Sequence, residues 1–133
     1  MTIRELATNW IEHSEEPVTF ITAADAARYI SWMDQQQIPD DLTPETFADI
    51  WNDVVGQHKL TEMRYQIEKV EHMAERSMVS AYEASERITE IISKAFPLDE
   101  IGLPDEDVTA RCEIVRRQAF RRMWRFLLRI TGA

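Results

Sequence analysis

LTEMRYQIEKVEHMAERSMVSAYEASERITEIISKAF, residues Leu60–Phe96, decides the fold, because this stretch of 37 residues contains neither Gly nor Pro. Small or apolar side chains recur along it in alternating steps of four and three. The members of this seam are Met63, Ile67, Val70, Ala74, Ser77, Ala81, Ala84, Ile88, Ile91 and Ala95. Heptad spacing of this kind is typical of a helix that packs along a second helix, as in a coiled coil. We therefore expect one long helix of about 50 Å.

Three shorter amphipathic patterns precede this stretch and predict a three-helix N-terminal unit. The first pattern places apolar side chains on one helical face, at Ile3, Leu6, Ala7, Trp10 and Ile11. Thr22 and Asp25 then resemble a capping box, which predicts a second helix to about Gln37. Thr43 is the expected N-cap of a third helix, and Gly56 its expected end. We accordingly divide the chain into a unit of residues 1–58 and a long helical hairpin of residues 59–133.

A basic helix closes the chain after the acidic loop of residues 97–107. Asp105 is its expected N-cap, and its inner side continues a heptad-like seam, widened by Phe120, Trp124 and Leu127. The loop is long enough for this helix to pack antiparallel on the long helix, so the predicted fold is an all-α bundle. The long helix exceeds it by about 15 Å, and the excess must meet the N-terminal unit or a second copy of the chain. We favour both, and therefore expect a homodimer. The seam assigned to that dimer comprises Met63, Ile67, Val70, Ala74, Ala81, Ala84 and Ile88.

Composition excludes several classes of protein. The chain has 44% hydrophobic residues, which is enough for a packed core rather than global disorder. Its single cysteine, Cys112, rules out an internal disulfide and suits a reducing compartment. The N-terminal residues lack the apolar run of a signal peptide, and no stretch is long and apolar enough to span a membrane. We expect a cytoplasmic protein.

Charge is unevenly distributed, with a formal net charge of −9 for the whole chain. Residues 111–133 hold seven Arg and one acid, Glu113, so a basic helix follows an acidic body. Arg117, Arg121, Arg125 and Arg129 lie four residues apart and form one line along the helix. The first interpretation is that these arginines neutralise the chain's own acids. The alternatives are that they bind nucleic acid, with an aromatic ring available for stacking, or an anionic membrane surface.

The acidic body offers a second candidate surface. Asp40, Asp41, Asp49 and Asp53 could imitate nucleic acid and occupy a basic groove on another protein, but ordinary solubilising surface is the preferred interpretation. Trp32 is either part of the small N-terminal core or a partner-binding hot spot.

Catalytic chemistry has the weakest support in the sequence. Glu68 and Glu71 have a spacing that could hold a metal, but Glu residues three apart occur freely on any solvated helix. No nucleophile signature surrounds Cys112, and no phosphate loop or zinc spacing occurs. We predict no catalytic residue, no metal and no cofactor.

The resulting hypothesis is a non-enzymatic protein that binds another protein. Its most concrete form is an acidic inhibitor or regulator of a nucleic-acid-handling machine. The alternative is a nucleic-acid-binding protein that uses the arginine-rich C-terminal helix.

Overall fold

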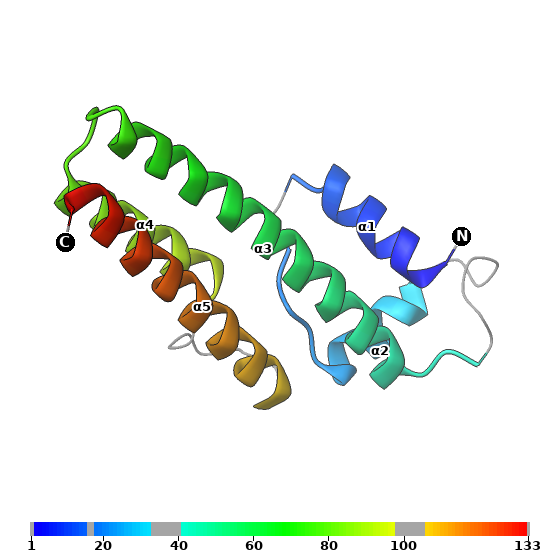
Figure 1. The fold of residues 1–133 in the computed structure, drawn as a ribbon. Coiled ribbons are helices and arrows are strands. Elements are labelled where there is room, and N and C mark those ends of the chain that lie inside the picture. The colour runs from blue at the N-terminus through cyan, green and yellow to red at the C-terminus, as the bar shows by residue number, and fades with distance from the viewer. Residues whose placement is uncertain (1, 16–17, 33–40, 98–105, 133) are drawn as a thin grey trace. The chain divides into compact units, whose positions relative to one another are not determined.

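The computed structural model describes residues 2–15, 18–32, 41–97 and 106–132, and these residues form helices without any strand (Figure 1). The helices are α1 (Ile3–His13), α2 (Ala23–Trp32), α3 (Pro44–Glu75), α4 (Ala81–Ala95) and α5 (Glu106–Thr131). The prediction of an all-α protein is confirmed for this part of the chain. Asp40 and Asp105, with the end of the expected second helix at Gln37, lie outside the described residues.

The chain forms two compact units, and both α3 and α5 contribute to each of them. The N-terminal unit contains α1, α2 and α3 as far as His58, together with the start of α5 to Val108. The C-terminal unit contains α3 from Lys59, then α4, and α5 from Thr109.

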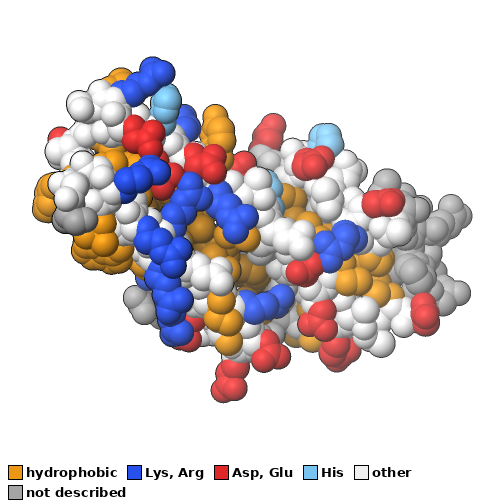
Figure 2. Space-filling view, in the orientation of Figure 1, with side chains coloured by type: hydrophobic (Ala, Val, Ile, Leu, Met, Phe, Trp, Pro, Cys, Tyr) orange, Lys and Arg blue, Asp and Glu red, His pale blue; other side chains and the backbone are white. Residues whose placement is uncertain are grey.

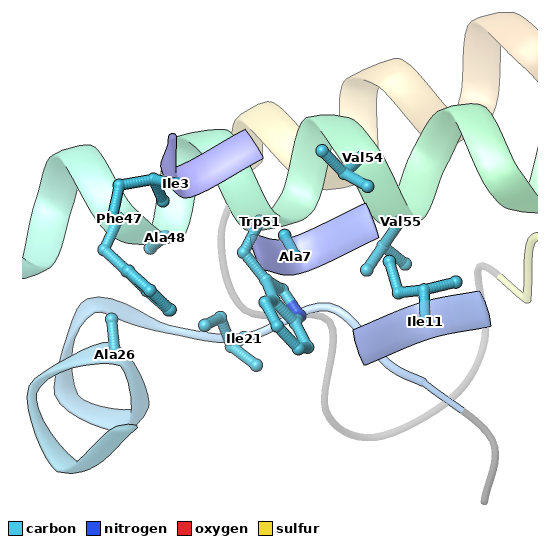
Figure 3. Packing of buried hydrophobic residues seen from close by; sticks show 10 residues of the cluster. All are labelled: Ile3, Ala7, Ile11, Ile21, Ala26, Phe47, Ala48, Trp51, Val54 and Val55. Carbon is cyan, nitrogen blue, oxygen red and sulfur yellow. The ribbon is translucent and has the colours of Figure 1, made fainter. Parts of the chain in front are cut away.

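The core of the N-terminal unit forms where α1, α2 and the first half of α3 meet. Phe47 and Trp51 from α3 stack with their ring centroids 6.1 Å apart, and both side chains are buried. Figure 3 shows side chains from α1 and from the segment before α2 pointing toward these rings. The cluster comprises Ile3, Ala7, Ile11, Ile21, Ala26, Phe47, Ala48, Trp51, Val54 and Val55. The stripe predicted for the first helix contributes Ile3, Ala7 and Ile11 to it.

Caps set the starts of these helices, largely where the sequence indicates them. The Thr22 hydroxyl accepts the Asp25 N–H at 3.2 Å, and the Asp25 carboxylate accepts the Thr22 N–H at 3.4 Å. The Thr43 hydroxyl accepts the Thr46 N–H at 3.1 Å, directly before α3 begins at Pro44. Both predicted caps are confirmed, because each hydroxyl satisfies a backbone donor that has no intrahelical partner.

The predicted helix end at Gly56 is wrong, because α3 continues through this residue to Glu75. One Gly inside a helix costs about 1 kcal/mol relative to Ala. Continuing the helix lets the next apolar stripe, Met63, Ile67 and Val70, reach buried positions. Burying such side chains contributes about 1.5–3 kcal/mol each, so burial outweighs the glycine penalty.

The predicted continuous helix from Leu60 to Phe96 is also wrong, because a turn separates α3 from α4. Ser77 has a left-handed backbone with φ of 59°. The N–H of Ser77 donates to the Ala74 carbonyl at 3.1 Å, and that of Met78 to the Met73 carbonyl at 2.9 Å. This pair of bonds is the Schellman arrangement, which satisfies carbonyls at the end of a helix. Ser80 then caps α4, since its hydroxyl accepts the Glu83 N–H at 3.1 Å.

The direction of α5 follows from its contacts inside the C-terminal unit. Arg122 binds Glu71 and Arg129 binds Glu75, so α5 runs parallel to the second half of α3. Arg116 donates to the Phe96 carbonyl, and Thr89 contacts the sulfur of Met123, so α5 is antiparallel to α4. In this unit α5 therefore packs parallel to one part, and antiparallel to the other part, of the stretch for which the sequence predicts a single long helix. The turn after α3 reverses the chain once before α5 begins.

Candidate functional site

Five arginines of α5 fall into two sets according to the side of the helix on which they lie. Arg122 donates to both carboxylate oxygens of Glu71, at 3.2 Å and 2.7 Å, and lies 3.7 Å from Glu68. Arg129 donates to Glu75 at 2.6 Å. These two arginines are engaged by acids of α3, as the interpretation of internal neutralisation expects.

Arg116 has a different role, at the end of α4. Its guanidinium donates to the Phe96 carbonyl at 2.8 Å, and Phe96 is the C-cap residue of that helix. A cation at a helix C-terminus satisfies a free carbonyl and faces the negative end of the helix dipole. Arg116 therefore stabilises the packing of α5 on α4.

Arg117, Arg121 and Arg125 form the second set, which points away from the packed side of α5. All three are exposed, and no ion pair joins any of them to an acid among the described residues. Of the four arginines predicted to form a line, only Arg129 pairs with an acid of the described chain. In Figure 2 a run of Lys and Arg side chains crosses α5, and hydrophobic side chains lie exposed on the same face.

Large apolar side chains share this side of the helix. Ile114 is 54% exposed, Trp124 60% and Leu128 51%. With the three arginines they fall at spacings of three and four, which places all six on one face. We call this set the α5 outer face, and it comprises Ile114, Arg117, Arg121, Trp124, Arg125 and Leu128. From Ile114 to Leu128 it extends about 21 Å along the helix.

Part of this face differs from what the sequence predicts. Trp124 is expected to widen the inner seam but lies outside it, so that expectation is wrong. Ile114 is off the buried seam of Cys112, Ala119 and Met123, and this offset is a signal that could have identified the outer apolar stripe.

The acidic candidate residues differ in their exposure and in their ion pairing. Asp41 and Asp49 are exposed, whereas Asp53 forms an ion pair with Arg4 of α1. Asp40 lies outside the described residues, and the structure describes Trp32 only as the last residue of α2. The interpretation of this surface as a nucleic-acid mimic stays a prediction.

The seam assigned to a dimer is covered within one chain over most of its length. Met63, Ile67, Val70, Ala84 and Ile88 are all buried, while Ala74 and Ala81 are partly exposed on either side of the turn. The seam is therefore divided between α3 and α4, and its bulky members contribute to the core of the single chain.

The residues considered for catalysis or metal binding are either paired with an arginine or buried. Glu68 and Glu71 both face Arg122, which occupies the position that a cation would need. The described residues contain no group of three or more His, Cys, Asp or Glu side chains that could hold a metal ion. Cys112 is 2% exposed, and burial raises the pKa of its thiol. A buried thiol with a raised pKa is a poor nucleophile.

Comparisons of the chain with models of protein families, with characterised proteins and with solved structures find no match. Within the described residues, no helix has the length and apolar character needed to cross a membrane.

Proposed function

We propose that the chain is a non-enzymatic protein-binding module whose α5 outer face docks an acidic amphipathic helix of a partner protein. One observation carries the proposal: three bulky apolar side chains, each more than half exposed, share a helix face with three arginines that no described acid neutralises. A single exposed apolar residue is ordinary, whereas an apolar stripe on one face favours an interface. Trp and Arg are also enriched among the residues that dominate binding energy.

The occupant follows from complementarity of shape and charge. A helix whose apolar residues repeat at i, i+3, i+4 and i+7 over about four turns could cover Ile114, Trp124 and Leu128. Glu or Asp residues flanking that stripe would then pair with Arg117, Arg121 and Arg125. The face extends about 21 Å, so roughly four turns of partner helix would match it.

Nucleic acid is the alternative occupant, since Trp124 could stack on a base beside the arginines. Two features oppose it. The chain carries a formal net charge of −9, which repels a polyanion. Ile114 and Leu128 would have no apolar counterpart along a phosphate backbone.

A second copy of the chain, as in the predicted homodimer, is another protein occupant. The lone buried Cys112 suits the cytoplasm as the compartment for such a module.

The test uses a labelled synthetic peptide of about four helical turns, in which Leu repeats at i, i+3, i+4 and i+7 and Glu fills the other positions, with fluorescence polarisation as the readout. Wild-type protein should bind it, and Trp124→Ala with Leu128→Ala should weaken binding by about tenfold or more. Arg117→Gln with Arg121→Gln and Arg125→Gln should weaken binding and reduce its dependence on salt.

Controls separate these effects from general changes in charge. Arg76→Gln with Arg87→Gln removes two exposed arginines elsewhere in the C-terminal unit and should leave binding unchanged. A peptide with Lys in place of Glu should not bind. Preferential binding of a single-stranded oligonucleotide would favour the alternative, and retention on anionic vesicles would favour a membrane surface. Self-association that disappears with Trp124→Ala would identify a second copy as the occupant. Failure of wild-type protein to bind the acidic peptide would contradict the proposal.

A further inference from the structure

A hollow on the N-terminal unit is lined by three aromatic rings and one carboxylate. Its volume is about 320 Å³, and its lining includes Trp10 of α1, Glu15, Tyr29 of α2 and Trp51 of α3. These residues come from separate segments, so the fold of the unit brings them together. The α5 outer face contributes nothing to this hollow, and the inference below is independent of the proposed function.

The inner rings of the hollow are held in fixed positions. Trp51 is 3% exposed, and its indole N–H donates to the Thr19 carbonyl at 3.0 Å. Tyr29 stacks on Trp51 with ring centroids 5.7 Å apart and an interplanar angle of 22°. Because both rings are packed before any ligand arrives, binding would cost little ordering at this end of the hollow.

Trp10 has a different exposure from the inner rings. Trp10 is not buried, since 54% of its surface is exposed. Ile11, its neighbour in sequence, is buried in the core. A Trp that is held at the edge of a hollow and left open to solvent adds a large ring face to which a ligand could bind. Folding of the unit does not require that ring, because it lies outside the buried cluster.

The charge of the hollow selects a cation. Aromatic faces carry partial negative charge and attract cations within about 6 Å of the ring centre. Glu15 adds a full negative charge at the same site, is exposed, and forms no ion pair with a described Lys or Arg. An anion would be repelled by this carboxylate, and a neutral apolar ligand would gain nothing from it.

We propose that this hollow binds a methylated ammonium group, held by the rings of Trp10 and Tyr29 and by the charge of Glu15, with the buried Trp51 supporting Tyr29. Methyl groups spread the charge over an apolar surface and weaken hydration, so such a cation leaves water for aromatic rings more readily than a primary ammonium. A free quaternary amine such as choline and the side chain of trimethyllysine share this chemistry.

The experiment titrates the full chain with choline and follows the indole N–H signals by NMR. Choline should shift the Trp10 and Trp51 signals, whereas 3,3-dimethylbutan-1-ol, its uncharged isostere, should bind at least about tenfold more weakly. Trp10→Ala should weaken choline binding about tenfold or more, and Trp10→Phe should restore part of it. Glu15→Gln should weaken it by a smaller factor, with a reduced dependence on salt.

Trp124→Ala, at an exposed Trp of the C-terminal unit, is the matched control and should leave choline binding unchanged. Equal affinity for choline and its uncharged isostere would overturn the proposal, as would a folded Trp10→Ala variant that binds choline like wild type. A peptide containing trimethyllysine, compared with the same peptide containing lysine, distinguishes the two sources. Tighter binding of the methylated peptide than of choline would point to a protein ligand, and equal binding to a small molecule.

Discussion

Arg122 of α5 and Glu71 of α3 form a two-point ion pair, with Nε 3.2 Å from one carboxylate oxygen and Nη2 2.7 Å from the other. The Glu71 side chain is only 14% exposed and the Arg122 side chain 39%, so the pair lies at the edge of a packed interface. Hydrogen bonding to Glu71 raises the pKa of the Arg122 guanidinium. Together with Arg129 and Glu75, this pair fixes the register of two parallel helices.

Replacing Arg122 should therefore destabilise the C-terminal unit. Arg122→Gln leaves the Glu71 carboxylate largely buried without its partner, and we expect a loss of about 1–2 kcal/mol in the free energy of unfolding, measured with urea. The partial exposure of Arg122 keeps the loss at this level, because solvent screens the charge. Lys94→Gln breaks the exposed pair with Glu90 and should leave the urea midpoint unchanged. Equal losses for the two variants would contradict this account.

Gly56 provides a test of the continuous α3 helix. A Cβ atom added at Gly56 would meet the Phe20 ring at 3.9 Å, which is an ordinary van der Waals distance. Since the residue is helical and space is available, Gly56→Ala should stabilise the protein by about 0.5–1 kcal/mol. Thermal unfolding followed by circular dichroism measures the gain. A helix that ended at Gly56 would instead be destabilised by this substitution.

Ser77 provides the complementary test at the end of α3. Its φ of 59° is a conformation that glycine adopts without cost. Ser77→Gly should therefore stabilise the protein by about 0.5–1 kcal/mol, whereas the β-branched Ser77→Val should destabilise it by a similar amount or more. Ser80→Ala removes the α4 cap and should cost about 1 kcal/mol. Urea unfolding compares the three variants. Stabilisation by Ser77→Val would show that the helix runs on through the turn.

These two positions show what the sequence could reveal about the fold. Helical periodicity and hydroxyl caps act locally, so the all-α class and the caps at Thr22 and Thr43 could be predicted. The lengths of α3 and α4 could not, because they depend on competition between local cost and tertiary burial. Gly56 is a weak breaker opposed by the burial of the stripe that follows it. Ser77 is an ordinary residue in a glycine conformation, and only Ser80 with Glu83 carried a readable capping signal.

Less of the candidate sites than of the fold could be predicted from the sequence. The line of arginines was visible in the sequence, but which arginines pair with α3 depends on the parallel course of α5. The aromatic hollow joins Trp10, Tyr29 and Trp51, which are far apart in sequence and belong to different helical patterns. No local rule places them together.

Asn52 was also missed, although it is the buried polar residue that connects α3 to the segment before α2. Its side chain accepts the Ile21 N–H at 2.8 Å and donates to the Ile21 carbonyl at 2.9 Å, and the residue is 3% exposed. Asn52→Ala leaves both backbone groups of Ile21 without a partner and should cost about 2–4 kcal/mol by urea unfolding.

A second substitution at this position separates the two hydrogen bonds. Asn52→Asp keeps an acceptor for the Ile21 N–H but places a carboxylate against the Ile21 carbonyl. Burial raises the pKa of such a carboxyl, so stability should be highest at low pH, where the group can still donate, and should fall as the pH rises. A loss that did not depend on pH would contradict the assigned hydrogen bonds.

Cys112 gives a prediction for alkaline pH. The residue is buried, and burial raises the pKa of its thiol above the ordinary value of 9.0, against the opposing effect of Arg111, Lys59 and Arg116. The folded chain therefore keeps the thiol proton at a pH where the unfolded chain loses it. This contribution to stability is fully present below pH 9.0 and declines as the pH rises from there toward the folded-state pKa. Urea unfolding of wild type and Cys112→Ala between neutral pH and pH 10 isolates the contribution, because the other titrating groups are common to both proteins. We expect the stability of wild type to fall more steeply than that of the variant over the alkaline part of the range.

A thiol reagent such as Ellman's reagent should also react slowly with the folded protein and quickly in urea, since both the burial of Cys112 and the absence of its thiolate oppose attack. Fast reaction without denaturant would place Cys112 at the surface, and it would reopen the question of a reactive thiol.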